Sequence, residues 1–241
     1  MVSAGSIVCD AGCDHGYVSI YLVQEKLCPR VIAMDINEGP LAQAKEHIRA
    51  FGLGEYIETR QSDGVEALSA GEADCLILAG MGGRLVIKIL TEGKEKIAAM
   101  KELILQPQSE IGAVRAYLLQ AGYMICQEDM VFEDGKYYPM MKAVKGSEKK
   151  ERAAEGSEAA FLRTRAYEQY GKCLLKERHP VLEQFLLWEQ KKDEGVLTAL
   201  RQGRPKDALR SMQRENELEE AARVRKYALS FFEKGDDKDA L

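Results

Sequence analysis

The chain has 241 residues, of which 46% are hydrophobic and 30% are charged, so a packed core can form and a wholly disordered protein is excluded. The longest apolar stretches, such as residues 75–79, are far too short to span a bilayer, and no secretory signal is visible at the N-terminus. The net charge of −5 is unevenly divided, because residues 1–141 hold 12 basic and 20 acidic side chains whereas residues 142–241 hold 22 and 19. An acidic first part and a weakly basic second part indicate two functional surfaces.

The six cysteines are scattered along the chain and include no Cys-x-x-Cys pair. This pattern predicts reduced, mostly buried thiols in a cytoplasmic protein and argues against a disulfide framework. Because the three histidines are also dispersed, we expect no metal site.

Strand-like and helix-like segments alternate over the first 145 residues. Short apolar or β-branched runs predict five strands, each followed by a helix, and the turn at Asp134-Gly135 predicts a terminal hairpin. The predicted strands are residues 6–10, 31–36, 56–59, 74–79 and 103–105, and the hairpin joins residues 123–132 to residues 137–144.

Two of the helices show clear apolar periodicity. Residues 38–50 repeat apolar side chains at helical spacing with Pro40 in the first turn, and residues 17–26 place Val18, Tyr21 and Leu22 at helical spacing. Repeated strand–helix units with right-handed crossovers predict an α/β fold with a doubly wound, mostly parallel seven-stranded, Rossmann-like sheet. The hairpin adds an antiparallel strand at one edge, and ligands are expected at the carboxyl ends of the parallel strands.

The composition changes after residue 146. Residues 147–234 are rich in Ala, Leu, Glu, Lys and Arg, which predicts a helical, coiled-coil-like appendage folded as an antiparallel hairpin. Pro205 is expected to open the second long helix after a break at Gly203. We therefore expect a sheet domain at residues 1–146, the helical domain, and a disordered tail at residues 235–241. The helical domain either has a binding role or only stabilises the sheet domain.

The loop after the first strand contains Asp10, Gly12, Asp14 and Gly16 in the pattern Asp-x-Gly-x-Asp-x-Gly. Dinucleotide-binding folds carry Gly-x-Gly-x-x-Gly at this place. Two carboxylates would repel a pyrophosphate but would attract the ammonium and sulfonium groups of a methionine-derived cation. The alternative is that the glycines only form a tight turn.

Acidic residues also follow the second and third strands. Asp35 ends the second strand, where a carboxylate can accept hydrogen bonds from two ribose hydroxyls. Asp63, before Gly64, could accept a hydrogen bond from an adenine amino group. Each aspartate could instead cap a helix, but acids in three successive loops favour an adenosyl-binding site.

The fourth strand ends in a glycine-rich loop, Ala79-Gly80-Met81-Gly82-Gly83. Such a loop lets the backbone approach a flat base or a methyl donor closely. Gln106 and Pro107 follow the fifth strand and are expected at the same cleft.

These motifs together resemble the bacterial tRNA (adenine-22-N1)-methyltransferase family, which are class I methyltransferases that use S-adenosyl-L-methionine. The resemblance is close over residues 2–145 and looser over the helical part. One departure is that the family's Ser-Asp-His-Ala reads Cys13-Asp14-His15-Gly16 here. The motifs that carry the resemblance are Asp10-Ala-Gly-Cys-Asp-His-Gly-Tyr17, Asn37-Glu-Gly-Pro40, Asp63-Gly64, Ala79-Gly-Met-Gly-Gly83, and Leu105-Gln-Pro107 with Arg115 and Leu118.

The resemblance implies methyl transfer to N1 of an adenine in tRNA, with S-adenosyl-L-methionine as the cofactor and tRNA as the partner. The expected cofactor-binding residues are Asp10, Gly12, Asp14, His15, Gly16, Asp35, Ile36, Asn37, Asp63, Gly64, Ala79, Gly80 and Met81. The expected catalytic residues are Asp14, His15, Gly80 and Met81, and the expected substrate-binding residues are Gly82, Gly83, Gln106, Pro107, Lys172, Lys176 and Arg178. Tyr17, Tyr137 and Tyr138 could stack on the target base or belong to the core.

Two other functions stay open on the sequence. A nucleotide-dependent oxidoreductase is disfavoured by the acidic first loop. A non-catalytic module could keep the fold and use the helical part as an adaptor. This alternative stays open because members of the family usually carry a basic helical segment before the first strand, whereas this sequence begins almost at that strand. We expect a monomer or a weak dimer with no membrane partner.

Overall fold

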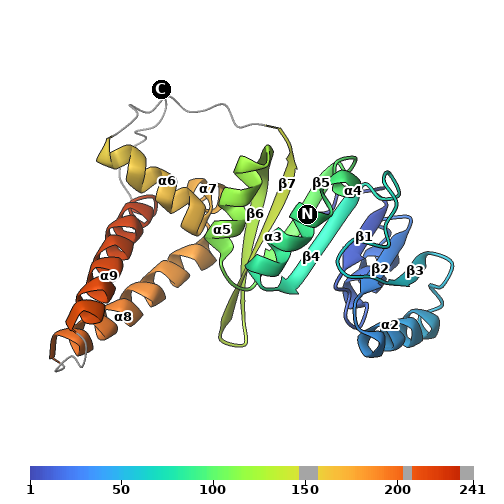
Figure 1. The fold of residues 1–241 in the computed structure, drawn as a ribbon, viewed down its shortest axis with the longest axis horizontal. Coiled ribbons are helices and arrows are strands. Elements are labelled where there is room, and N and C mark those ends of the chain that lie inside the picture. Colours follow the sequence, from blue (N-terminus) through green and yellow to red (C-terminus); the bar gives the residue numbers. More distant parts are fainter. Residues whose placement is uncertain (147–156, 203–207, 234–241) are drawn as a thin grey trace. The chain divides into compact units, whose positions relative to one another are not determined.

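The computed structural model describes residues 1–146, 157–202 and 208–233, and Figure 1 shows its ribbon. The chain forms two compact units. The first comprises Met1–Asp129 and Tyr138–Glu148, and the second comprises Met130–Tyr137 and Lys149–Leu241. The sequence placed the division at residue 146, whereas in the structure residues 130–137 at the tip of the hairpin group with the helices.

A seven-stranded sheet runs in the order β3-β2-β1-β4-β5-β7-β6. Neighbouring strands from β1 to β5 pair in parallel, and β7 pairs antiparallel with β5. The predicted α/β fold with a mostly parallel seven-stranded sheet is therefore confirmed. The strands are β1 (Val8–Ala11), β2 (Val31–Asp35), β3 (Ile57–Gln61), β4 (Cys75–Met81), β5 (Glu102–Pro107), β6 (Tyr123–Glu133) and β7 (Lys136–Lys145).

Helices cover both faces of this sheet, because its buried residues alternate between two cores. Ile32 and Met34 of β2 pack in one core with residues of α3 and α5, and Val31 and Ala33 pack in the other core with residues of α1 and α2. This alternation confirms the doubly wound arrangement. The helices of the first unit are α1 (Tyr17–Gln24), α2 (Glu38–Ala50), α3 (Gly83–Glu92), α4 (Lys94–Ile97) and α5 (Ile111–Gln120).

The prediction of a helix between the third and fourth strands is wrong. Residues 62–74 form turns and bends between β3 and β4. Gly64 and Gly71 adopt positive φ angles of 53° and 78°, which a continuous right-handed helix cannot contain. The glycines therefore divide this connection into turns.

Of the three residues expected at the apolar spacing of α1, only Leu22 is buried. Val18 and Tyr21 are 43% and 59% exposed, whereas Ser19 and Ile20 are buried. Ser19 faces inward because its hydroxyl donates a 2.6 Å hydrogen bond to Oδ2 of Asp10. A buried carboxyl group thus sets the rotation of this helix.

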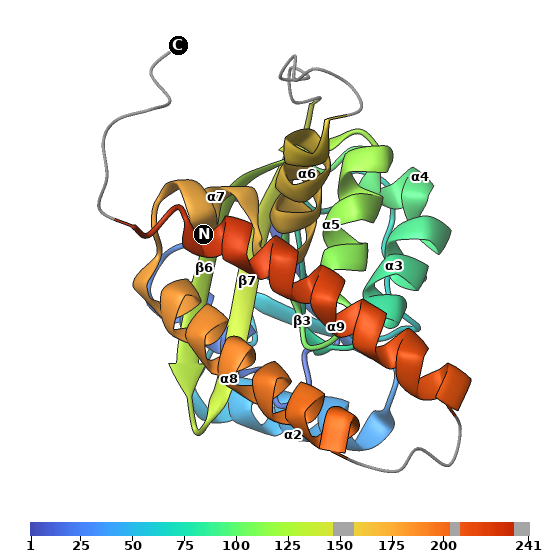
Figure 2. The same ribbon diagram turned by 90° about the vertical axis from the view of Figure 1, so that its left-hand side faces the viewer.

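The second unit consists of helices and the hairpin tip. Its helices are α6 (Glu158–Tyr170), α7 (Lys172–Lys176), α8 (Pro180–Gln202) and α9 (Ala208–Leu229), and Ser157 caps α6 by accepting a hydrogen bond from the Ala160 amide. Figure 2 shows α8 and α9 in front of the viewer, and α9 packs against both α6 and α8. The predicted helical appendage is confirmed, with α6 and α7 added to the expected hairpin of two helices.

The core of this unit contains a buried ionic cluster as well as apolar side chains. Arg225 is 2% exposed and donates hydrogen bonds of 2.8 and 2.7 Å to Asp193, and Tyr170 donates one of 2.7 Å to Glu189. These contacts join α6, α8 and α9. The predicted break at Gly203-Arg204-Pro205 and the predicted tail lie outside the described residues. Within the part of the chain that the structure describes, every helix is too short or too polar to cross a membrane.

Candidate functional site

Four loops meet at the carboxyl ends of the parallel strands. The amides of Gly12 and Cys13 donate to the Met34 carbonyl at 2.8 and 2.9 Å, which joins the loop after β1 to the end of β2. A Cβ atom on Gly12 would lie 2.5 Å from Cε of Met81, so the same loop also touches the end of β4. The Ser62 amide donates to the Asp35 carbonyl at 3.0 Å and brings in the loop after β3. The structure therefore brings together the loops that the sequence singled out.

The first loop takes its shape from left-handed backbone positions. Gly12, Asp14 and Gly16 have φ angles of 79°, 49° and 77°. Gly16 precedes α1, and a Cβ atom there would lie 3.2 Å from Cβ of Ala44 in α2. Glycine thus allows α2 to pack directly against the loop.

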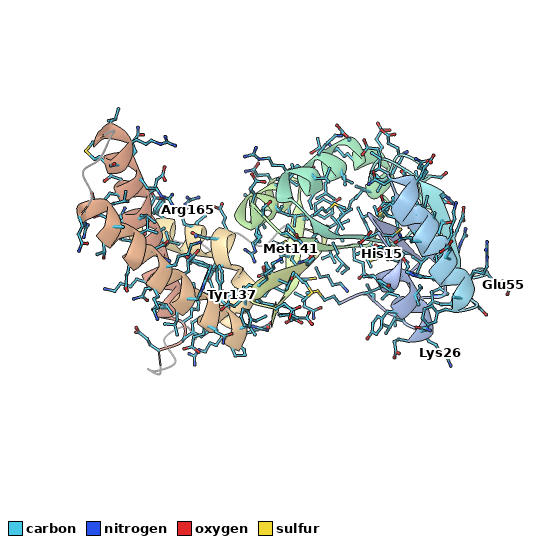
Figure 3. All side chains as sticks on the ribbon, turned by 90° about the horizontal axis from the view of Figure 1, so that it is seen from below. His15, Lys26, Glu55, Tyr137, Met141 and Arg165 are labelled. Atoms are coloured by element: carbon cyan, nitrogen blue, oxygen red, sulfur yellow. The ribbon has the colours of Figure 1, made fainter. Side chains whose placement is uncertain are left out.

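The two acids of this loop lie in different environments. Asp10 is 3% exposed and bonded to Ser19, and burial, with a smaller contribution from the nearby Asp35 carboxylate, raises its pKa to about 6. The Asp14 side chain is mostly exposed, with Oδ1 3.6 Å from Nε2 of His15. His15 is labelled in Figure 3. Asp10 can therefore supply a buried negative charge, and Asp14 and His15 are accessible to a substrate.

Asp35 is held as an acceptor at the end of β2. Its side chain accepts the Asn37 amide at Oδ1 (2.9 Å) and the Asp14 amide at Oδ2 (3.2 Å), and the residue is only 8% exposed. Each carboxylate oxygen can accept one further hydrogen bond. This geometry suits two adjacent hydroxyl groups.

A pocket of about 490 Å³ lies beside Asp35, between the loops after β2 and β3. Asp63 is half-exposed there, with Oδ2 3.6 Å from Nζ of Lys88. Gly64 follows it, and a Cβ atom at that position would contact Ile89 at 2.9 Å. The pocket can accept a flat base with polar edges, and its walls are Ile36, Gln61, Ser62, Asp63, Glu66 and Ala67.

The glycine-rich loop after β4 is braced by the loop after β5. The Gly80 amide donates to Oε1 of Gln106 at 2.7 Å, and the register of β4 against β5 shifts between Ala79 and Met81, which pairs with Pro107. Gly82 precedes α3 and lies in the open. The backbone at Gly80 and Gly82 can therefore approach a ligand.

Gly83 fixes α3 against the loop after β5. Its amide donates to the Ser109 carbonyl at 3.1 Å, and a Cβ atom at Gly83 would lie 2.4 Å from that oxygen. Gly83→Ala should lower the free energy of unfolding by about 2 kcal/mol, because a backbone atom must move. Urea unfolding measures this. Gly39→Ala in α2 is the control, because a Cβ atom there meets nothing within 4 Å, and an equal loss in both variants would contradict the prediction.

The three basic residues expected to bind substrate belong to the second unit. Lys172 is half-buried with Nζ 5.8 Å from the centre of the Tyr167 ring, and Lys176 and Arg178 are exposed. Tyr137, labelled in Figure 3, also belongs to the second unit and packs at 5.0 Å against Phe185.

Sequence reasoning missed several residues at the site. The sequence does not single out His47, yet its Nδ1 lies 3.0 Å from the His15 carbonyl and its ring stacks on Tyr17 at 5.1 Å. Gln61, Glu66 and Ala67 line the pocket without having been singled out. Their closeness to Asp63 in the sequence could have identified them as pocket residues.

Comparisons with known proteins agree on one group of relatives. Residues 1–141 match the model of a methyltransferase domain family. The tRNA (adenine(22)-N(1))-methyltransferase of Bacillus subtilis is 38% identical over 142 residues, which are 59% of this chain and 60% of that protein. The aligned part of the chain spans about three-fifths of the curated relatives of this kind that it matches.

Solved structures are similar over nearly the whole chain. The B. subtilis m1A22 tRNA methyltransferase TrmK has a TM-score of 0.79 and 30% identity, covering 95% of this chain and 94% of that one. A candidate tRNA (m1A22) methyltransferase of Streptococcus pneumoniae, in complex with S-adenosyl-L-methionine, gives the same TM-score, identity and coverage.

Proposed function

Because this chain belongs to the methyltransferase domain family, and within it to the tRNA (m1A22) methyltransferases, we propose that it transfers a methyl group from S-adenosyl-L-methionine to N1 of adenine 22 in tRNA. Such a reaction would place it in the bacterial cytoplasm with tRNA as its partner. The observation that carries the proposal is the Asp35 carboxylate, held by two backbone amides beside a base-sized pocket.

The residues present fit this methyl donor. Asp35 offers acceptors for the two ribose hydroxyls, and the adjoining pocket, with Asp63, suits the adenine. Gly12, at a positive φ angle, lets the first loop pack against the Met81 side chain, which a Cβ atom would meet at 2.5 Å. Asp10 and Asp14 supply negative charge for the ammonium and sulfonium groups. The other residues that we propose for this site are His15, Gly16, Ile36, Asn37, Gly64, Ala79 and Gly80.

When bound, the cofactor supplies an electrophilic methyl group on a sulfonium ion. The protein must therefore present adenine N1 in line with that methyl group, and N1 already carries the lone pair that attacks. N1 lies on the Watson–Crick edge, so the base must leave its pair, at a cost of roughly a few kcal/mol. Gly80, Gly82 and Gln106 border the open end where the base would enter.

Methylation makes the adenine cationic, and a proton then leaves its N6 amino group. Asp14 and His15 are accessible beside the first loop and are the groups we propose for stabilising this charge or accepting the proton. Because the first part of the chain is acidic, we propose that Lys172, Lys176 and Arg178 of the second unit bind tRNA phosphates.

The direct test is incubation of the protein with tRNA and labelled methyl donor, followed by nuclease digestion and mass analysis. We expect 1-methyladenosine at position 22, and a loss of donor binding of about 100-fold or more in Asp35→Ala. Asp134→Ala in the hairpin turn is the control for removal of one negative charge. S-adenosylhomocysteine binding without any methyl transfer would instead support an adaptor, and binding of NAD alone would support an oxidoreductase.

A further inference from the structure

The pocket wall between β3 and β4 is shaped by side chains, since the described residues there form no helix. Oγ of Ser62 accepts the Ala67 amide at 3.0 Å and closes the turn that contains Asp63. The Ser69 amide donates to Oε2 of Glu72 at 2.9 Å and closes the turn that follows.

An ion pair between Arg60 and Glu72 joins the two ends of this connection. NH1 and NH2 of Arg60 donate to the two carboxylate oxygens of Glu72 at 2.8 and 2.5 Å, and both side chains are about one-fifth exposed. This paired geometry is the strongest form of arginine–carboxylate contact. The guanidinium group lowers the pKa of Glu72 to about 2, so the pair stays charged at every physiological pH.

The wall is also held through its backbone. NH1 of Arg60 donates to the Ala67 carbonyl at 3.1 Å. Nζ of Lys96, in α4, donates to the carbonyls of Val65 and Glu66. Three consecutive carbonyl groups are thus fixed by side chains from β3 and α4, and Glu66 and Ala67 line the pocket.

We propose that Arg60, Glu72 and Lys96 are positioning residues that hold the wall in the shape required by the adenine of the methyl donor. This inference rests on the proposed function. A turn-rich segment without such contacts would have to become ordered when the ligand binds, and that cost would weaken binding. Because the three side chains already order this segment when the protein folds, ligand binding does not have to order it.

The effect should be confined to the adenosine end of the ligand. The methionine end faces the Asp10–Gly16 loop, whose hydrogen bonds run to Met34, Asp35 and Ser19. Loss of the Arg60 contacts should therefore raise KM for S-adenosyl-L-methionine and leave kcat at saturating donor within about twofold. A role in stability alone would lower the active fraction, and hence the apparent kcat, without changing KM.

The experiment compares Arg60→Ala with a matched control, Arg30→Ala. Arg30 pairs with one carboxylate oxygen of Glu58 at 2.6 Å, and Nε of Arg60 donates to the other at 2.7 Å. Arg30→Ala therefore removes an arginine of the same ion network that, within the described residues, makes no contact with the wall. Calorimetry with S-adenosylhomocysteine and with 5′-methylthioadenosine, which lacks the amino-acid end, reports Kd. We expect Arg60→Ala to weaken both ligands by about tenfold and Arg30→Ala to change neither by more than about twofold.

Three results would separate the possibilities. Equal Kd and KM values in Arg60→Ala and wild type would overturn the positioning role. Failure of the wild-type protein to bind either ligand would overturn the proposed function itself. If Arg60→Ala does not fold, Glu72→Gln tests the positioning role instead, because glutamine keeps the shape of the glutamate side chain and removes its charge. We expect it to weaken both ligands by about threefold, and unchanged binding would again overturn the role.

Discussion

Asp10→Asn should raise the free energy of unfolding of the ligand-free protein by about 3 kcal/mol at pH 8 and change it little at pH 4. The Asp10 pKa rises from 3.8 to about 6 on folding, chiefly through burial. The carboxyl group therefore stabilises the folded state fully only below pH 3.8, and this contribution is lost as the pH rises through 6. The asparagine side chain removes the charge and can still accept the Ser19 hydrogen bond.

The same substitution should weaken binding of the methyl donor. The negative charge that destabilises the empty site is the charge that would attract the ammonium and sulfonium groups, so we expect the Kd for S-adenosyl-L-methionine to rise at least about tenfold. Urea unfolding at both pH values and calorimetry at pH 8 measure the two effects. Asp134→Asn controls for net charge. A variant that is less stable than wild type at pH 8 would refute the role of burial.

Glu128→Ala should lower the free energy of unfolding by about 3 to 5 kcal/mol. Oε1 of Glu128, on β6, lies 2.8 Å from Nε of Arg115, on α5, and their side chains are 0% and 3% exposed. Removal of the carboxylate would take a charged hydrogen-bond acceptor away from a buried guanidinium group. We measure the effect by urea unfolding at pH 7.

The paired substitution Arg115→Leu with Glu128→Leu is the informative control. It removes the buried guanidinium group together with the carboxylate and should cost less than Glu128→Ala. The free energy of interaction from the cycle of Arg115→Leu, Glu128→Leu and the double variant should exceed about 2 kcal/mol. Additive losses from the two single variants would mean that the ion pair does not couple α5 to β6.

The fold was predictable where a local pattern and the tertiary structure agree. The predicted helix at residues 38–50 coincides with α2, because Leu41, Ala44 and Ile48 are all buried on one face. The hairpin was predictable from Asp134-Gly135, since both residues adopt the positive φ angles that the turn requires. The face of α1 was predictable only at Leu22, because the buried side also includes Ser19, whose hydrogen bond to Asp10 only folding creates.

The loops that form the site were predictable from the sequence, but the contacts that arrange their side chains were not. The sequence indicates that Asp35 and Asp63 follow successive strands, and the parallel order of those strands places them at one edge. It does not indicate that the Asp14 amide orients Asp35, or that His47 reaches back to His15. Such contacts join separate elements, and no periodic pattern in the sequence predicts them.

The side-chain bracing of residues 62–72 has an evolutionary consequence. A segment fixed by three long side chains, and not by a ladder of backbone hydrogen bonds, can gain or lose residues without shifting the register of the sheet beneath it. An insertion or deletion in this segment would therefore reshape the wall beside Asp63 while the strands that carry Asp10 and Asp35 keep their pairing.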